Sequence, residues 1–398
     1  MLASDSRPVH TSPVAAYLTG FVFIGIALST AGPALSALRD GVGTDDSGIA
    51  TLFVGSSGGY IAGSFLAGRL LDAGHGHRAW IAAMWIAVAS MLGVAASPSL
   101  GLLVASFTVL GCVCGLSDVC GNTLVIWSRP SGSSALLNAL HMMFAVGAML
   151  APVLVNRSLA WFDSVWGVTV PMALIAAWCT WMLARHEAPQ KSRSVAAAPT
   201  DGSAARTEAR GVLVAAVCVF FFAYVALETG FAGWIHTYVE QIGYGDATTA
   251  TGVITTFWVG FTLGRVLSIP LARRVAPGTM VGGAMALSVV ASVLFWVARG
   301  GGPMLWVVTF LFAVSIAPQY ASMMAFAEQH LALSGGNTAA IIACSGIGGL
   351  VLPWLLGQLF DAIGPEALPP TITIVAVITT VVAAVTGRLL VGSDRRGA

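Results

Sequence analysis

Long apolar runs of about 20 residues alternate along the chain with short clusters of charged residues, glycine and proline. A run of this length crosses a bilayer as a single helix, because a helix rises about 1.5 Å per residue. The pattern predicts twelve membrane-spanning helices. Their expected bounds are 14–38, 46–70, 79–97, 101–127, 133–156, 163–184, 211–239, 248–271, 278–298, 303–326, 336–360 and 370–391.

A polar segment, residues 185–210, separates the sixth predicted span from the seventh. It is rich in Ala, Ser and Arg and lacks the apolar periodicity of a helix, so we interpret it as a flexible cytoplasmic linker. The chain then divides into an N-terminal six-helix bundle, residues 1–184, and a C-terminal six-helix bundle, residues 211–398. The predicted fold class is an all-α membrane protein.

The composition agrees with this pattern. Of the 398 residues, 57% are hydrophobic and 9% are charged, and the mean hydropathy is +0.86, whereas a soluble protein carries about 25% charged residues. A net charge of +1 gives no case for nucleic-acid binding. The six cysteines fall inside apolar runs without CxxC spacing, so we interpret them as small buried hydrophobes and expect no metal site and no cofactor.

The basic residues predict the orientation. With both termini in the cytoplasm, 15 of the 18 Lys and Arg residues lie inside and only Arg39, Arg157 and Arg299 lie outside. Positive charge favours the cytoplasmic side of short loops. We therefore expect a multi-pass protein of the cell inner membrane with both termini cytoplasmic.

The two halves resemble each other in sequence. FAVGAMLAP (residues 144–152) in span five matches SGIGGLVLP (345–353) in span eleven, with Gly and Pro at the same positions. The Gly-Arg pair near the end of span two, at residues 68–69, matches the pair near the end of span eight, at 264–265. Two related halves suggest a parallel repeat about an axis normal to the membrane, which predicts a substrate site near mid-depth between them.

Two carboxylates lie well inside the predicted spans, Asp118 in span four and Glu228 in span seven. A carboxylate at membrane depth costs about 2.5–3.5 kcal/mol on insertion scales and normally faces a bundle interior or a water-filled path. Asn122 lies four residues after Asp118 and therefore on the same helical face. We predict both acids as proton or cation coupling sites. The alternative for Asp118 is a structural role, in which a neighbouring helix donates hydrogen bonds to its carboxylate. The alternatives for Glu228 are binding of substrate hydroxyls and a structural hydrogen bond.

Further polar and aromatic side chains inside the spans are candidates for substrate binding. An amide supplies both a donor and an acceptor, as sugar hydroxyls require, and aromatic rings can stack on the apolar face of a sugar. The alternative role for His141 is a structural hydrogen bond, and the alternative role for Trp234 is that of an anchor at the membrane interface. The candidates are Asn122, Asn138, His141, Trp234, Gln319 and Tyr320.

The loop GRLLDAGHGHR between spans two and three joins a carboxylate to flanking guanidinium groups at the cytoplasmic rim. Such groups can latch onto the other half, although an ordinary positive-inside loop would look the same. The loop resembles the conserved loop motif of the major facilitator superfamily, which implies twelve helices in two pseudo-symmetric bundles and a role in conformational gating. The residues concerned are Gly68, Arg69, Asp72, Gly74 and Arg78.

Three further stretches, residues 118–122, 137–148 and 224–234, resemble the fucose–proton symporter family and its sodium-dependent glucose-transporter relatives. The resemblance implies a proton-coupling role for Asp118 in its Asp-x-x-x-Asn pattern, and a sugar-binding role for Asn138. Span one lacks the acidic residue that fucose permeases carry, whereas span seven carries Glu228. The resemblance therefore leaves open whether a proton or sodium is the coupling ion.

Together these features predict a monomeric secondary active transporter of a small polar solute, a sugar or polyol, driven by a proton or cation gradient through alternating access. The alternative is an exporter of drugs or amphipathic metabolites, since 12 Trp and 13 Met could line an adaptable apolar site. An enzyme is not expected, because no nucleophile–base pair, HExxH or GxGD motif is present.

Overall fold

The computed structural model describes residues 13–128, 133–189, 204–272, 274–297, 302–331 and 335–397, with the backbone alone for some helical residues. The described secondary structure is entirely helical and contains 12 helices that are long and apolar enough to cross a membrane. Each overlaps one of the twelve predicted spans, so the predicted fold class is confirmed.

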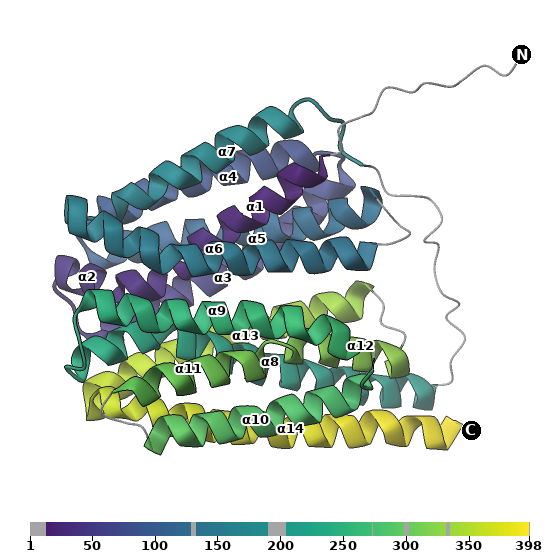
Figure 1. Cartoon of the computed structure of the whole chain (residues 1–398). Helices are drawn as coiled ribbons and strands as arrows, with labels where there is room; N and C mark the ends of the chain where they lie inside the picture. The colour runs from purple at the N-terminus through teal and green to yellow at the C-terminus, as the bar shows by residue number, and fades with distance from the viewer. Residues whose placement is uncertain are drawn as a thin grey trace, which may run out of the picture.

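Helices α1–α7 form one group and α8–α14 a second group beside it (Figure 1). The bounds are α1 Val14–Ser29, α2 Ala31–Val42, α3 Asp46–Asp72, α4 Gly76–Ala95, α5 Leu100–Ser128, α6 Ser133–Phe162, η1 Val165–Val168, α7 Thr169–Leu183, α8 Ala204–Gln241, α9 Ala247–Ala272, α10 Pro277–Val297, α11 Pro303–Ile316, α12 Gln319–Leu331, α13 Gly335–Ile363, η2 Pro365–Ala367 and α14 Leu368–Gly397.

The first helix begins and the last helix ends on the same side of the molecule, at the right in Figure 1. We call this side the terminal end and the opposite side the far end. Helix α8 already begins at Ala204, so residues 204–210 extend the seventh span instead of belonging to a non-helical linker.

Two spans are broken into half-helices. The first span is interrupted at Thr30, whose hydroxyl donates to the backbone oxygen of Ile26 at 2.7 Å, as a hydroxyl can when it competes with the helix ladder. The tenth span is interrupted between α11 and α12 at Pro318, which has no N–H to continue the ladder. Gln319 and Tyr320 begin the second half-helix.

The internal repeat is visible in the packing. Gly147 of α6 lies so close to α1 that an added Cβ would overlap the backbone oxygen of Val22, and Gly348 of α13 stands in the same relation to Phe222 of α8. Matched glycines therefore bring matched helix pairs into backbone contact, as small residues do in membranes. A 3₁₀ turn also precedes both α7 and α14.

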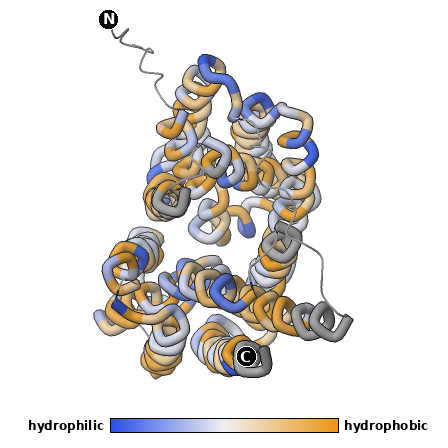
Figure 2. Tube along the Cα trace, turned by 90° about the vertical axis from the view of Figure 1, so that its right-hand side faces the viewer, coloured by the Kyte–Doolittle hydropathy of each residue, from blue (hydrophilic) through white to orange (hydrophobic). Residues whose placement is uncertain are grey.

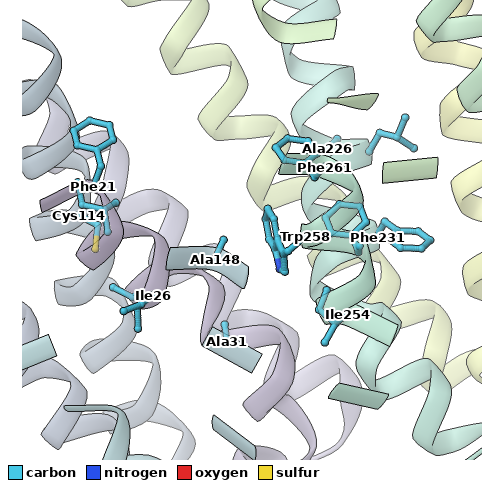
Figure 3. Packing of buried hydrophobic residues seen from close by; sticks show 14 of the residues in the cluster. Phe21, Ile26, Ala31, Cys114, Ala148, Ala226, Phe231, Ile254, Trp258 and Phe261 are labelled. Atoms are coloured by element: carbon cyan, nitrogen blue, oxygen red, sulfur yellow. The ribbon is translucent and has the colours of Figure 1, made fainter. Parts of the chain in front are cut away.

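Buried apolar side chains fill both halves. Phe21 and Ile26 belong to the first, and Phe231, Trp258 and Phe261 to the second (Figure 3). Hydrophobic residues also run along the helices of both halves (Figure 2), and many of their large side chains are exposed. Leu174 of α7 is 68% exposed and Val297 of α10 is 76% exposed. Such a surface suits acyl chains rather than water.

Candidate functional site

Asp118 of α5 is held by two side chains of the N-terminal half. The hydroxyl of Tyr60, on α3, donates to Asp118 Oδ2. Asn122 Nδ2 donates to Asp118 Oδ1 at 3.0 Å and to its backbone oxygen at 2.9 Å. The predicted common face of Asp118 and Asn122 is therefore real, and both carboxylate oxygens have a donor. All three side chains remain partly exposed, and Tyr60 and Asp118 lie well inside their spans.

The C-terminal half brings a second set of polar groups to the same region. Glu228 of α8 interacts electrostatically with Arg265 of α9 and with the neighbouring Tyr224. The guanidinium of Arg265 lies over the ring of Phe261, 4.5 Å from its centroid, a cation–π arrangement. Among the described side chains Arg265 forms no salt bridge, so its charge is only partly compensated.

Tyr320 and His141 connect the two sets. Tyr320 interacts electrostatically with Asp118 of the first half and with both Glu228 and Arg265 of the second. Arg265 Nη1 reaches across to the backbone oxygen of His141, on α6, at 3.5 Å. We call Tyr60, Asp118, Asn122, His141, Tyr224, Glu228, Arg265 and Tyr320 the inter-half cluster.

The charges of this cluster do not cancel. The cluster contains two carboxylates, Asp118 and Glu228, and one guanidinium, Arg265, which interacts with Glu228, so the fully ionised cluster carries one net negative charge. An uncompensated charge at membrane depth is costly, and binding of a proton or a monovalent cation would neutralise it. The hydroxyl and amide groups around it supply both donors and acceptors for a polar solute.

The far end is closed by contacts between the halves. Asp361, near the end of α13, accepts hydrogen bonds from the backbone N–H groups of Asp46 at 2.9 Å and Ser47 at 2.5 Å, the first two residues of α3. Gln241 Nε2 donates to Asp46 Oδ2 at 2.8 Å, and Arg39 pairs with Asp46 Oδ1 at 2.7 Å. Free amides at a helix N-terminus favour an anion, so Asp361 caps α3 from the opposite half.

Further contacts seal this end. Ser36 donates to Glu240 Oε2 at 2.6 Å between α2 and α8. Gly357 of α13 packs so tightly on α3 that an added Cβ would overlap Ala50. The sequence did not predict that these acids join the halves.

Residues 17–353 match the family model of the Major Facilitator Superfamily. The chain belongs to this superfamily. It is therefore a multi-pass membrane protein and a secondary transporter rather than an enzyme. The superfamily assignment from the loop motif is confirmed.

Relatives within the superfamily are distant. The chain is 26% identical over 379 residues to sodium-dependent glucose transporter 1 of Danio rerio, an alignment that covers 86% of this chain and 64% of that protein. It is also 26% identical over 384 residues to sodium-dependent glucose transporter 1A of Mus musculus, covering 85% of this chain and 87% of that protein. The chain thus spans somewhat less than two thirds of the Danio rerio relative.

Solved structures share the fold. The E. coli fucose:proton symporter FucP superposes with a TM-score of 0.65 at 17% identity, covering 95% of this chain and 98% of that one. The nucleoside transporter NupG gives a TM-score of 0.74 at 12% identity, covering 94% and 99%. At these identities the likeness establishes the major facilitator fold and nothing narrower.

The structure brings together Asp118, Asn122, Glu228, His141 and Tyr320 of the predicted site residues. The ring of His141 packs edge-on against Phe21 at 6.0 Å between centroids. The side chain of Asn138 lies outside the described residues.

Two predicted substrate-binding residues are committed to packing in this conformation. Trp234 is fully buried, donates its indole N–H to the backbone oxygen of Pro353 at 2.9 Å, and packs on Phe53 and Phe360 near the far end. It therefore has no free ring face for a sugar here. Gln319 is also fully buried and donates to the backbone oxygen of Ser315 at 3.2 Å, while its Oε1 has no partner among the described groups.

The loop of the superfamily motif caps α3. Gly74 has φ +78°, its N–H donates to Leu71 O at 2.9 Å, and the N–H of His75 donates to Leu70 O at 2.9 Å. This is a Schellman cap, and its left-handed position favours glycine.

The motif's charged residues do not latch the halves in this conformation. Asp72 and Arg78 border a cavity of about 970 Å³ whose other walls come from α5 and residues 183–189 of the same half. Within the described ranges neither residue, nor Arg69, forms a salt bridge to the C-terminal half. Their gating role stays a prediction for the conformation that is closed at the terminal end.

Sequence reasoning missed Tyr60, Tyr224 and Arg265. The predicted topology counts Arg265 among the cytoplasmic basic residues, as is usual for a long basic side chain near a helix end. The structure instead turns it into the inter-half cluster. Its position seven residues before the end of α9 was the available signal. Tyr60 has a similar signal, since it is a hydroxyl-bearing residue midway along α3.

Proposed function

We propose that the chain is a symporter that moves a small uncharged polar solute, a sugar or polyol, together with a proton or sodium ion. The observation that carries this proposal is the inter-half cluster, where Asp118 faces Tyr320 across the boundary between the halves. A transporter needs its coupling group where both halves can reach it. The printed names of the distant relatives, sodium-dependent glucose transporters and a fucose:proton symporter, support the same class of substrate and driving ion.

Asp118 is the coupling residue in this proposal. Tyr60 and Asn122 hold the two oxygens of its carboxylate, so the side chain is oriented before a cation arrives. Uptake of a proton or sodium ion by Asp118 neutralises the net negative charge of the cluster. The protein passes through the closed intermediate of alternating access at a lower free-energy cost when the cluster is neutral than when it is charged. Ion binding is thereby linked to the conformational change.

The solute binds beside this group. Asn122, His141 and Tyr320 are partly exposed and offer amide, imidazole and hydroxyl groups from both halves. Each can donate or accept, which is what the hydroxyls of a sugar require. Arg265 and Glu228 supply the charged groups on the C-terminal side of the site.

The orientation follows from the basic residues. Because the topology predicted from the sequence puts 15 of the 18 Lys and Arg residues on the side of the termini, we assign the terminal end to the cytoplasm. The far-end closure then makes the present conformation the inward-facing one, in the cell inner membrane. Asp361, Asp46 and Glu240 belong to the extracellular gate of this proposal.

Transport in proteoliposomes tests the proposal. Labelled hexoses and polyols are supplied with an imposed pH or sodium gradient, and accumulation and solute exchange are measured separately. Asp118→Asn should abolish gradient-driven accumulation, because an amide takes up no proton and binds a cation weakly, while exchange persists. Glu366→Gln, which removes an exposed acid outside the cluster, should transport like the parent chain.

Two outcomes would contradict the proposal. Normal gradient-driven accumulation by Asp118→Asn would exclude this residue as the coupling group. If the sugar and polyol panel neither moves nor raises the melting temperature, while lipophilic cations do both, the exporter alternative replaces the symporter.

A further inference from the structure

A groove of about 860 Å³ lies in the C-terminal half between α10, α12 and α14. Its walls are mainly apolar and include Val281 and Met285 of α10, Met323 and Phe326 of α12, and Ala383 of α14. No residue of the inter-half cluster lines it. The groove is therefore a feature separate from the proposed transport site, with a volume in the range of ligand pockets.

The groove opens on the lipid-facing side of the molecule. Helices α10 and α14 form the outer edge of the C-terminal half (Figure 1). On the same helices, Val290 is 54% exposed and Val381 is 56% exposed. In a chain with twelve membrane spans such a surface meets acyl chains, so the ligand nearest to the groove is lipid.

The polar groups of the groove gather at its terminal end. Arg388 is exposed and lies four residues before the end of the last span, Pro365–Gly392, which is the level of lipid headgroups. Thr279 near the start of α10 and Gln329 near the end of α12 line the same end. No acidic residue lines the groove, and Arg388 forms no salt bridge with any described side chain.

Glycines keep the groove open. Gly282 of α10 lines it, and a Cβ at this position would meet no atom within 4 Å. The ring of Phe326 forms the floor between Gly278 of α10 and Gly387 of α14, 3.0 Å and 3.6 Å from the positions their Cβ atoms would take. A long, narrow apolar chain fits such a space better than a globular solute.

We infer that this groove binds an anionic glycerophospholipid, with the phosphate on Arg388 and an acyl chain along the apolar wall. Charge complementarity selects an anionic over a zwitterionic headgroup, since the only charged side chain lining the described groove is positive. The bound lipid touches α12, the half-helix that also carries Tyr320 to the inter-half cluster.

Thermal unfolding of the purified, delipidated full-length chain tests the inference. Phosphatidylglycerol and phosphatidylcholine with the same acyl chains are titrated separately, and the melting temperature gives an apparent Kd for each. Phosphatidylglycerol should bind more tightly. Arg388→Gln should weaken its apparent Kd about fivefold, the effect of one basic residue near a membrane surface. The matched control, Arg274→Gln, removes an exposed charge at the same end but outside the groove and should bind like the parent.

A second pair of variants tests the apolar wall. Gly282→Trp fills the groove and should abolish the phosphatidylglycerol shift, whereas Gly283→Trp, one residue further on and equally free of neighbours, does not line the groove and should keep it. Equal stabilisation by the two lipids, an unchanged Kd in Arg388→Gln, or an equal shift with inorganic phosphate would overturn the inference. The inference would also be overturned if the parent chain were a dimer and Gly282→Trp were a monomer, because the groove would then be an interface between two copies.

Discussion

The capping of α3 by Asp361 offers a direct test of how the far end is held closed. Asp361 accepts from the N–H groups of Asp46 and Ser47, which have no acceptor within their own helix. Asp361→Ala leaves both amides without this partner when the far end is closed, whereas water reaches them when it is open. The substitution should therefore shift the conformational equilibrium toward the open far end.

The size of the shift follows from the two hydrogen bonds. A hydrogen bond to a charged group contributes roughly 1.5–3 kcal/mol when buried. Asp361 is exposed, so solvent screening reduces this to about 1 kcal/mol for each bond. Loss of both then costs about 2 kcal/mol, which corresponds to a roughly 30-fold change in the ratio of open to closed far ends.

Spin-label distances at the far end measure this ratio. Ser99→Cys before α5 and Thr248→Cys in the first turn of α9 place exposed labels on opposite halves, in a chain whose six native cysteines are replaced. Asp361→Ala should increase the long-distance population. Asp45→Ala removes a cap of α3 from within the same half, the bond to Gly48 N–H at 2.7 Å, and should not. An unchanged distribution in Asp361→Ala, or equal opening in Asp45→Ala, would refute the reasoning.

Three further predictions concern stability, measured as melting temperature. Gly348→Ala should destabilise by about 1–3 kcal/mol because the methyl overlaps a backbone oxygen of α8, whereas Gly349→Ala meets no atom closer than 3.5 Å and should be neutral. Gly74→Ala should cost about 1–2 kcal/mol because of its positive φ. The hydrogen bond from the backbone N–H of Thr249 holds the pKa of Asp246 below its usual range. The parent chain should therefore melt at a higher temperature than Asp246→Ala at neutral pH, and this difference should fade below about pH 4.

Each of these has a contrary result. Equal melting temperatures for the two glycine variants of α13 would mean that the helices are further apart than described. A neutral Gly74→Ala would mean that the loop adopts another turn. The sign for Asp246 follows from its lowered pKa, because a carboxylate that is more acidic in the folded chain stabilises it only while ionised. A difference from Asp246→Ala that grows in acid would contradict the cap.

The sequence by itself determined the twelve spans, because the length and apolarity of a span are local properties that the bilayer requires. It also determined that Asp118 and Asn122 share a face, since a spacing of four fixes this in any helix. The hydrogen bond between their side chains confirms that geometry. The matched glycines of spans five and eleven were visible for the same reason, as a local motif that occurs twice.

Only the tertiary structure decided the partners. Tyr60 lies 58 residues from Asp118, Arg265 lies 124 from His141, and Asp361 lies 315 from Asp46. Within one span the same arginine can reach the membrane surface or turn toward a neighbouring half, and local sequence does not distinguish these choices. The packing of α9 against α6 turned Arg265 inward, and the closure of the far end buried Trp234. The pairing of helices distant in the chain therefore decided which polar residues form the site.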